Sequence, residues 1–184
     1  RGADLHPFIG YNFRLSELHA AVGLAQIRKL DHFLAIQKKN HTALKAILSQ
    51  VPEITFRKVP DENGDSCTFL SWFLPTAEAT KAVVDSMKAK GILAGNFYWF
   101  DNNWHYIRKW EHLKKSVTLN SLHPDLKEAV MHHATKDFAP SDAIMSRCVS
   151  TAIGLLWTPE QLQTKAEQMI DVIKEVLSSQ VEKV

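Results

Sequence analysis

The feature that most constrains the fold is a long helical stretch that changes character halfway along. Ser16 is a suitable N-cap, Glu17 suits the positive end of a helix dipole, and the helix is predicted to run to about Gln50, where Val51-Pro52 ends it. Its first half is apolar on opposite faces, whereas its second half is apolar along one stripe. A helix that is apolar all round is buried on several sides. We therefore expect the first half to pack against something outside this chain, such as a large domain or a second subunit.

The residues of the two halves show this contrast directly. In the first half Leu18 and Val22 share one face, while Leu24 and Ile27 lie on nearly the opposite one. The second half has a single stripe, formed by Phe33, Ile36, Leu44 and Ile47. The second half is therefore predicted to be a surface helix.

The rest of the chain alternates short strands with helices. Strands are predicted over 54–59, 67–74, 92–97 and 149–153, and helices over 76–90, 106–115, 141–148 and 158–177, with a weak helical signal at 126–132. Thr158, Pro159 and Gln161 form a strong helix start with a capping box, and Gly91 is a helix stop. The first two strands are expected to be antiparallel. The order predicts an α+β fold, in which helices cover a small antiparallel sheet.

Composition excludes several classes of protein. The 184 residues suffice for one domain, and no apolar run approaches the roughly 20 residues that span a bilayer. No signal peptide is visible, so a cytoplasmic location is expected. The net charge is only +2, and basic residues alternate with acidic ones, which argues against nucleic acid as a partner. The chain opens at Arg1 without a Met, which we take as a sign that it is part of a longer protein.

Cysteine and histidine give no metal pattern. Cys67 and Cys148 are far apart in sequence and are expected to be buried thiols in a reducing compartment. His123, His132 and His133 have no zinc-ligand spacing, so we expect them to be exposed to solvent.

Two stretches carry polar groups that suit a ligand. Asn12 and Arg14 precede the first helix, where backbone N–H groups and a guanidinium favour an anion. On physical grounds alone, a tight turn with a surface arginine explains them better. From Phe97 to Trp110, seven aromatic residues are interleaved with amide, carboxylate and imidazole groups. Such a block suits a polyhydroxylated ligand, and filling a core or an interface is the alternative.

The string from Gly10 to Gln26, GYNFRLSELHAAVGLAQ, resembles a motif of the DegT/DnrJ/EryC1/StrS family of pyridoxal-phosphate-dependent sugar aminotransferases. That motif reads Gly-Tyr-Asn-x-Arg-Leu/Met-x-Glu-Leu-x-Ala-Ala and precedes a long helix. The remaining chain follows the family's order of elements more loosely to about Leu177. It departs near 153–158, where the family often has Leu-Pro. The sequence of residues 101–106, DNNWHY, resembles the subfamily that acts on 3,8-dideoxyoctulosonate.

The resemblance implies the small C-terminal domain of a type I aminotransferase fold, over 16–184, with 1–15 leading from a large domain. It also implies a homodimer with shared active sites. Asn12 and Arg14 would then reach the pyridoxal phosphate or the substrate of the neighbouring subunit. The substrate contacts implied by position are Trp99, Asp101, Asn103 and His105.

The chemistry implied is transfer of an amino group, with glutamate as the expected donor, to a keto or aldehyde sugar that can be nucleotide-linked. The family's cofactor lysine lies upstream of the motif, and no lysine here has the sequence setting such a residue needs. The chain alone is therefore expected to be inactive. Two alternatives stay open: a non-catalytic sugar-binding or dimerisation domain, and a sugar dehydratase of the same fold that uses pyridoxamine phosphate.

Overall fold

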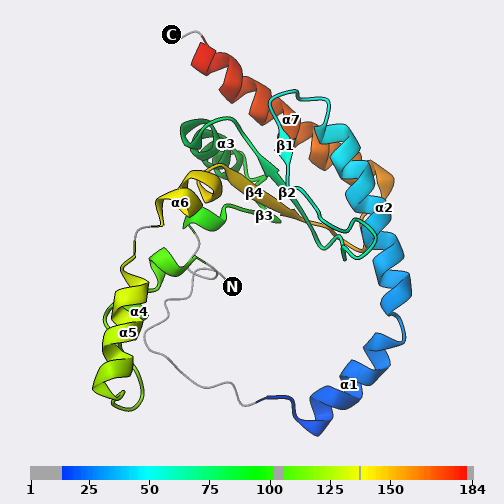
Figure 1. Cartoon of the computed structure of the whole chain (residues 1–184). Helices are drawn as coiled ribbons and strands as arrows, with labels where there is room; N and C mark the ends of the chain where they lie inside the picture. Colours follow the sequence, from blue (N-terminus) through cyan, green and yellow to red (C-terminus); the bar gives the residue numbers. More distant parts are fainter. Residues whose placement is uncertain (1–13, 102–105, 137, 182–184) are drawn as a thin grey trace.

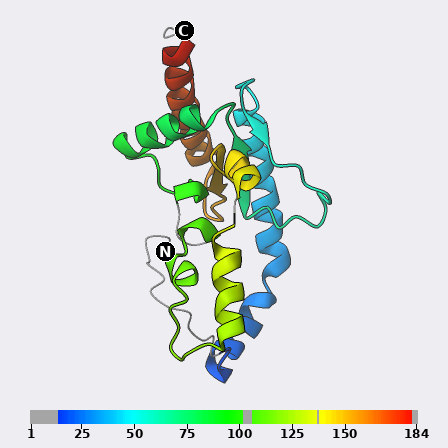
Figure 2. The same cartoon turned by 60° about the vertical axis from the view of Figure 1, so that its left-hand side comes forward.

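The computed structural model describes residues 14–101, 106–136 and 138–181, and its elements are arranged as a sheet domain with two arms (Figure 1). One arm is α1 (Glu17–Ile27), which continues outward from α2 (Leu30–Leu48). The other arm is formed by α4 (Glu111–Lys114) and α5 (Pro124–Ala134), which pack on one another. Figure 2 shows both arms extending to the same side of the sheet domain.

The sheet has four strands in the order β1-β2-β4-β3, and all neighbours are antiparallel. The strands are β1 (Thr55–Phe56), β2 (Phe69–Phe73), β3 (Asn96–Phe97) and β4 (Cys148–Ala152). Helices α2, α3 (Ala77–Ala89) and α7 (Pro159–Val181) enclose the core. The short helices η1 (Trp99–Asp101), η2 (Ile107–Lys109) and α6 (Ala139–Met145) lie near the end of the sheet that leads to the second arm. The predicted α+β class, with an antiparallel sheet covered by helices, is confirmed.

Alternation along β2 explains why helices cover one face of the sheet. Leu70 and Trp72 are buried against the helices, whereas Phe69 is 38% exposed on the other face. The Trp72 indole N–H donates to Thr151 Oγ1 at 3.0 Å, and that hydroxyl donates to Asn96 Oδ1 at 2.6 Å. This chain of hydrogen bonds crosses three strands and satisfies polar groups that would otherwise be costly to bury.

Several predicted details are confirmed. Thr158 Oγ1 accepts from the Gln161 amide at 3.2 Å, and Gln161 Oε1 accepts from the Thr158 amide at 3.0 Å, which is the predicted capping box. Gly91 follows α3 with φ +72°, a conformation that a helix-ending glycine adopts without strain. Cys67 and Cys148 are buried free thiols.

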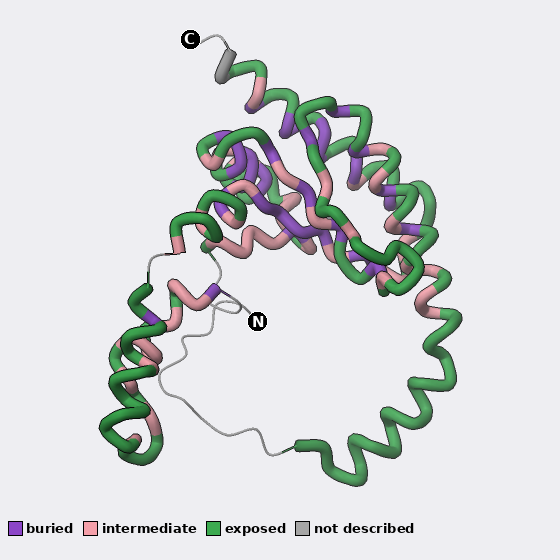
Figure 3. The backbone as a smooth tube through the Cα atoms, in the orientation of Figure 1, coloured by how far each residue is buried: buried purple, intermediate pink, exposed green. Residues whose placement is uncertain are grey.

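The predicted single helix from Ser16 to Gln50 is wrong, because the chain turns between α1 and α2. Arg28 ends α1, and Lys29 leaves helical geometry with φ −103° and ψ 2°. Figure 3 shows α1 exposed along its whole length, while buried residues begin within α2. An 11-residue helix without tertiary packing is only marginally stable. Little free energy therefore favours a single straight helix over two helices joined by a turn.

Other boundaries also differ from prediction. The expected helix over 106–115 is divided into η2 and α4, because Trp110 has φ −90° and ψ 74°. The expected strands over 54–59 and 92–97 are two residues each, and Gly95 turns the chain with φ +78° just before β3. The stretch with only a weak helical signal forms the full helix α5, which begins at Pro124.

Within the described residues, no helix is both long and apolar enough to cross a bilayer. His123, His132 and His133 are exposed as predicted. No three His, Cys, Asp or Glu side chains of the described part gather as metal ligands would.

Candidate functional site

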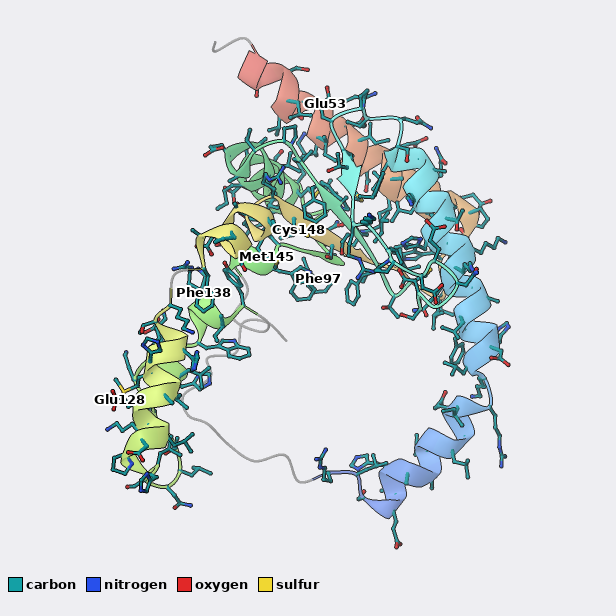
Figure 4. The ribbon with its side chains drawn as sticks, viewed as in Figure 1. Glu53, Phe97, Glu128, Phe138, Met145 and Cys148 are labelled. Carbon is teal, nitrogen blue, oxygen red and sulfur yellow. The ribbon has the colours of Figure 1, made fainter. Side chains whose placement is uncertain are left out.

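Three rings on the sheet face opposite α2, α3 and α7 form an aromatic cluster, consisting of Phe69, Phe97 and Trp99. The rings of Phe97 and Trp99 are nearly parallel, at 11° with centroids 5.2 Å apart. Phe69 meets both rings edge-on, with centroid distances of 5.8 Å and 6.0 Å. Edge-to-face and stacked contacts of this kind fix ring orientation. Figure 4 shows Phe97 projecting from the sheet toward the side on which the two arms extend.

The strand register brings these rings together. Phe97 of β3 lies opposite Ser150 of β4, and Phe69 of β2 lies opposite Ala152. On the same face, Ser71 Oγ and Ser150 Oγ are 2.7 Å apart and share a hydrogen bond. This pair of hydroxyl groups adjoins the aromatic cluster, but Ser150 is only 3% exposed, so the pair satisfies its own hydrogen bonds within the sheet.

Helix η1 carries the polar edge of the site. Asp101 is exposed, and its carboxylate lies 3.9 Å from the Lys109 amino group, so it can accept hydrogen bonds from a ligand. Tyr98 donates its hydroxyl proton to the Ser146 carbonyl at 2.9 Å. Burial, followed by the nearby carboxylates of Asp101 and Asp85, raises the pKa of Tyr98 to about 12. Tyr98 is therefore a neutral anchor for η1.

A second anchor holds η2 against α6. Asp142 accepts hydrogen bonds from the Tyr106 hydroxyl and from both ends of the Arg108 guanidinium, with 2.9 Å between Arg108 Nε and Asp142 Oδ1. Arg108 also lies over the Phe138 ring, 5.8 Å from its centroid. A bidentate arginine–carboxylate pair is more directional than a single ion pair. The chain on both sides of residues 102–105 is thus fastened to the region of α6.

The sequence-predicted substrate residues divide into two groups. Trp99 and Asp101 lie within the three residues of η1, so the structure brings them together beside the aromatic cluster. Asn103 and His105 lie outside the described residues.

The residues predicted to hold the cofactor also divide. Asn12 lies outside the described residues, while Arg14 is exposed with φ +67° and stands just before α1. Ser16 Oγ accepts from the His19 amide at 3.3 Å, which confirms the predicted N-cap. Helix α1 lies at the far end of its arm from the sheet (Figure 1), so the fold of one chain does not place Arg14 in the aromatic site.

Sequence reasoning missed parts of this site. Phe69 was assigned only to a strand, although the alternation of Phe69 and Ser71 with buried neighbours could have placed both on a ligand-accessible face. The pairing of Arg108 with Asp142 had no signal, because the two residues are 34 positions apart in elements of irregular spacing.

Comparisons with known proteins agree with this architecture. A sequence profile of the DegT/DnrJ/EryC1/StrS aminotransferase family matches residues 2–169. The GDP-4-keto-6-deoxy-D-mannose 3-dehydratase of Yersinia pseudotuberculosis is 31% identical over 100 residues, covering 48% of this chain and 24% of that protein. The enzyme of the same name from Escherichia coli O55:H7 is 28% identical over 96 residues, with the same coverage. The matched stretch thus spans about a quarter of the length of either relative.

The fold has a counterpart among solved structures. The crystal structure of 3-amino-5-hydroxybenzoic acid synthase superimposes with a TM-score of 0.57 and 22% identity, covering 94% of this chain and 42% of that one. At this identity the likeness concerns the fold.

Proposed function

The chain belongs to the DegT/DnrJ/EryC1/StrS aminotransferase family, and from this premise we propose that it is the C-terminal small domain of a sugar aminotransferase. The domain would span residues 16–184, with 1–15 leading from a large domain. The complete enzyme would transfer an amino group from an amino acid, with glutamate as the expected donor, to a keto or aldehyde sugar in the biosynthesis of amino sugars or surface polysaccharides. The profile match through residues 2–169 carries this proposal.

Pyridoxal phosphate would supply the electron sink for the complete enzyme. The residues of this chain fit its phosphate group, because the exposed Arg14 stands at the N-terminal end of α1, where cationic and N–H donors suit an anion. We propose that Asn12 and Arg14 serve the site of a second subunit. This role agrees with the exposure of apolar side chains along α1, among them Leu18 at 75% and Leu24 at 58%.

The described lysines offer no good position for holding the cofactor. Lys165 comes nearest, because burial lowers its pKa. Its amino group, however, donates to the Ala94 carbonyl at 2.8 Å and lies 5.9 Å from the centre of the Trp157 ring. A lysine engaged in this way is a structural tether, so we propose that the chain alone does not catalyse transamination.

The aromatic cluster and η1 would form part of the wall of the sugar site. Ring faces contact the apolar C–H surface of a sugar, while the exposed Asp101 can meet its hydroxyl groups. We include Asn103 and His105 in this wall as expectations from their position in the family resemblance. A nucleotide-linked sugar is the favoured substrate, since both curated relatives are named for a GDP-linked keto-deoxy sugar.

The names of those relatives also favour one alternative, a dehydratase of the same fold that uses pyridoxamine phosphate. Product analysis separates the two reactions. The longer protein that contains this chain should be incubated with cofactor, glutamate and a nucleotide-linked 4-keto-6-deoxy sugar, and the product mass measured. Replacement of the carbonyl by an amino group supports transamination. Loss of water from the sugar supports dehydration and would overturn our first choice. If neither product forms with a panel of such sugars, the non-catalytic sugar-binding or dimerisation role becomes the better account.

The sugar wall is tested by Trp99→Leu in the same protein. Loss of a stacking ring should raise KM about tenfold and change kcat little, because the contact forms in the bound ground state. Phe33→Leu, a half-buried ring on α2, is the matched control and should leave KM unchanged. Equal effects of the two substitutions would contradict the assignment.

A further inference from the structure

A cavity, here called the α2 pocket, lies between α2 and the connection from β1 to β2. Its volume is about 210 Å³. Lys38, His41, Thr42 and Lys45 line one side, and Asp65 and Cys67 line the other. A smaller cavity adjoins it, shares His41 and Lys45, and adds Arg57. The smaller cavity also reaches Phe69 and Ser71 of the candidate site, whereas no residue of η1 or of the aromatic cluster lines the α2 pocket itself.

The helix side of the α2 pocket is a stripe of basic residues. Lys38, His41 and Lys45 are spaced by three and four positions, which places them on one face of α2. Lys45 lies over the Phe56 ring at 5.6 Å. Among the described residues, no ion pair joins Lys38 or Lys45 to a carboxylate. Two cationic groups thus line the cavity without a direct ion pair.

The acidic group of the α2 pocket is already engaged. The carboxylate of Asp65 accepts from the Arg57 guanidinium at 3.1 Å and from the Cys67 amide at 3.0 Å. Its side chain is only 15% exposed. Glu62 lines the pocket too, but it is an exposed residue of the turn. With Asp65 neutralised by Arg57, the lysines leave the cavity with an excess of positive charge.

The imidazole of His41 and the thiol of Cys67 have pKa values shifted in favour of their neutral forms. Burial lowers the pKa of His41, Asp65 opposes that shift, and Lys45 and Arg57 reinforce it. Burial and the carboxylate of Asp65 raise the pKa of Cys67, so its thiol is neutral and does not repel an anion. A neutral imidazole can donate one N–H to an anion, and in a cationic pocket an anion would favour its second proton.

We propose that the α2 pocket binds a small phosphate-type dianion, with Lys38, His41 and Lys45 as its ligands. The cavity is concave and enclosed by a helix and a loop, which suits a free phosphate or a phosphate monoester. A metal ion fits poorly, because cationic side chains face the cavity and no group of three metal-ligating side chains occurs among the described residues.

The test is a pH titration of the histidine imidazole signals by NMR on the 184-residue chain. His41→Gln identifies the signal of His41. Inorganic phosphate should raise the pKa of His41 by about half a unit or more relative to chloride at equal ionic strength, because the bound anion stabilises the imidazolium. An equal pKa of His41 in both salts would overturn the proposal.

A matched pair of variants locates the site. Lys45→Gln removes the charge over Phe56 and leaves a polar side chain that is about one atom shorter, and it should weaken phosphate binding about tenfold. Lys39→Gln changes an exposed lysine that does not line the pocket and should leave binding unchanged. Equal losses in the two variants would contradict the site.

A hexose phosphate then distinguishes the source of the anion. Tighter binding of the ester than of inorganic phosphate assigns the α2 pocket to a sugar phosphate, and equal binding assigns it to free phosphate. Both results support a phosphate site, whereas equal binding of unphosphorylated hexose would overturn it.

Discussion

At the scale of single residues, Trp72 links the sheet to its core. It is fully buried, and its N–H donates to Thr151. Trp72→Phe removes that donor and shortens the ring, so we expect the free energy of unfolding to fall by about 1–3 kcal/mol. Urea unfolding measures the change. Trp157→Phe, at a half-buried ring on the rim of the core, should cost under about 0.5 kcal/mol. Equal losses would contradict the role given to the buried hydrogen bond.

His41 gives the chain a pH dependence of stability. Its folded-state pKa lies below its ordinary value of 6.5, so the unfolded chain binds the proton more readily. The contribution of His41 is therefore fully present above pH 6.5 and is lost as the pH falls through the folded-state value. In a buffer free of polyanions, His41→Gln should flatten the decrease in stability below pH 6.5, and the exposed His132→Gln should not. Identical profiles for wild type and His41→Gln would disprove this.

At the scale of elements, α1 is a helix that is exposed along its length within the described part of the chain. It has no buried residue, although it carries several large apolar side chains. Leu18→Glu combined with Leu24→Glu should leave the unfolding free energy of the chain unchanged within about 0.5 kcal/mol, because both side chains are exposed. The same substitutions should abolish self-association, as followed by light scattering. A large loss of stability would show that α1 packs within the chain.

Elements with strong local signals were predictable from the sequence. The capping box at Thr158 and the helix stop at Gly91 depend on neighbouring residues, and both were placed correctly. The break at Lys29 was not, because a continuous helical pattern does not show which half has a surface to pack on. In the candidate site, Trp99 and Asp101 were proposed from the aromatic stretch and its position in the family, whereas Phe69 and Asp142 are placed there by strand register and long-range contacts.

At the scale of the whole molecule, a closed core contrasts with open functional surfaces. Helices α2, α3 and α7 bury one face of the sheet, while α1 has no buried residue and the aromatic cluster is partly exposed. Such a chain is stable through its core and suited to complete a site with other parts of an enzyme. The predicted cross-subunit role of Asn12 and Arg14 and the predicted sugar wall are consistent with this division.

The central claim is that this chain shapes an aminotransferase site without holding the cofactor covalently. The most direct measurement is borohydride reduction of the 184-residue chain with pyridoxal phosphate, followed by mass spectrometry of its peptides. We predict sparse labelling spread over exposed lysines, with none of them stoichiometric. Full labelling of one lysine would contradict the claim and place the cofactor's attachment within this chain. Lys165 is the lysine to compare with the others, because burial lowers its pKa.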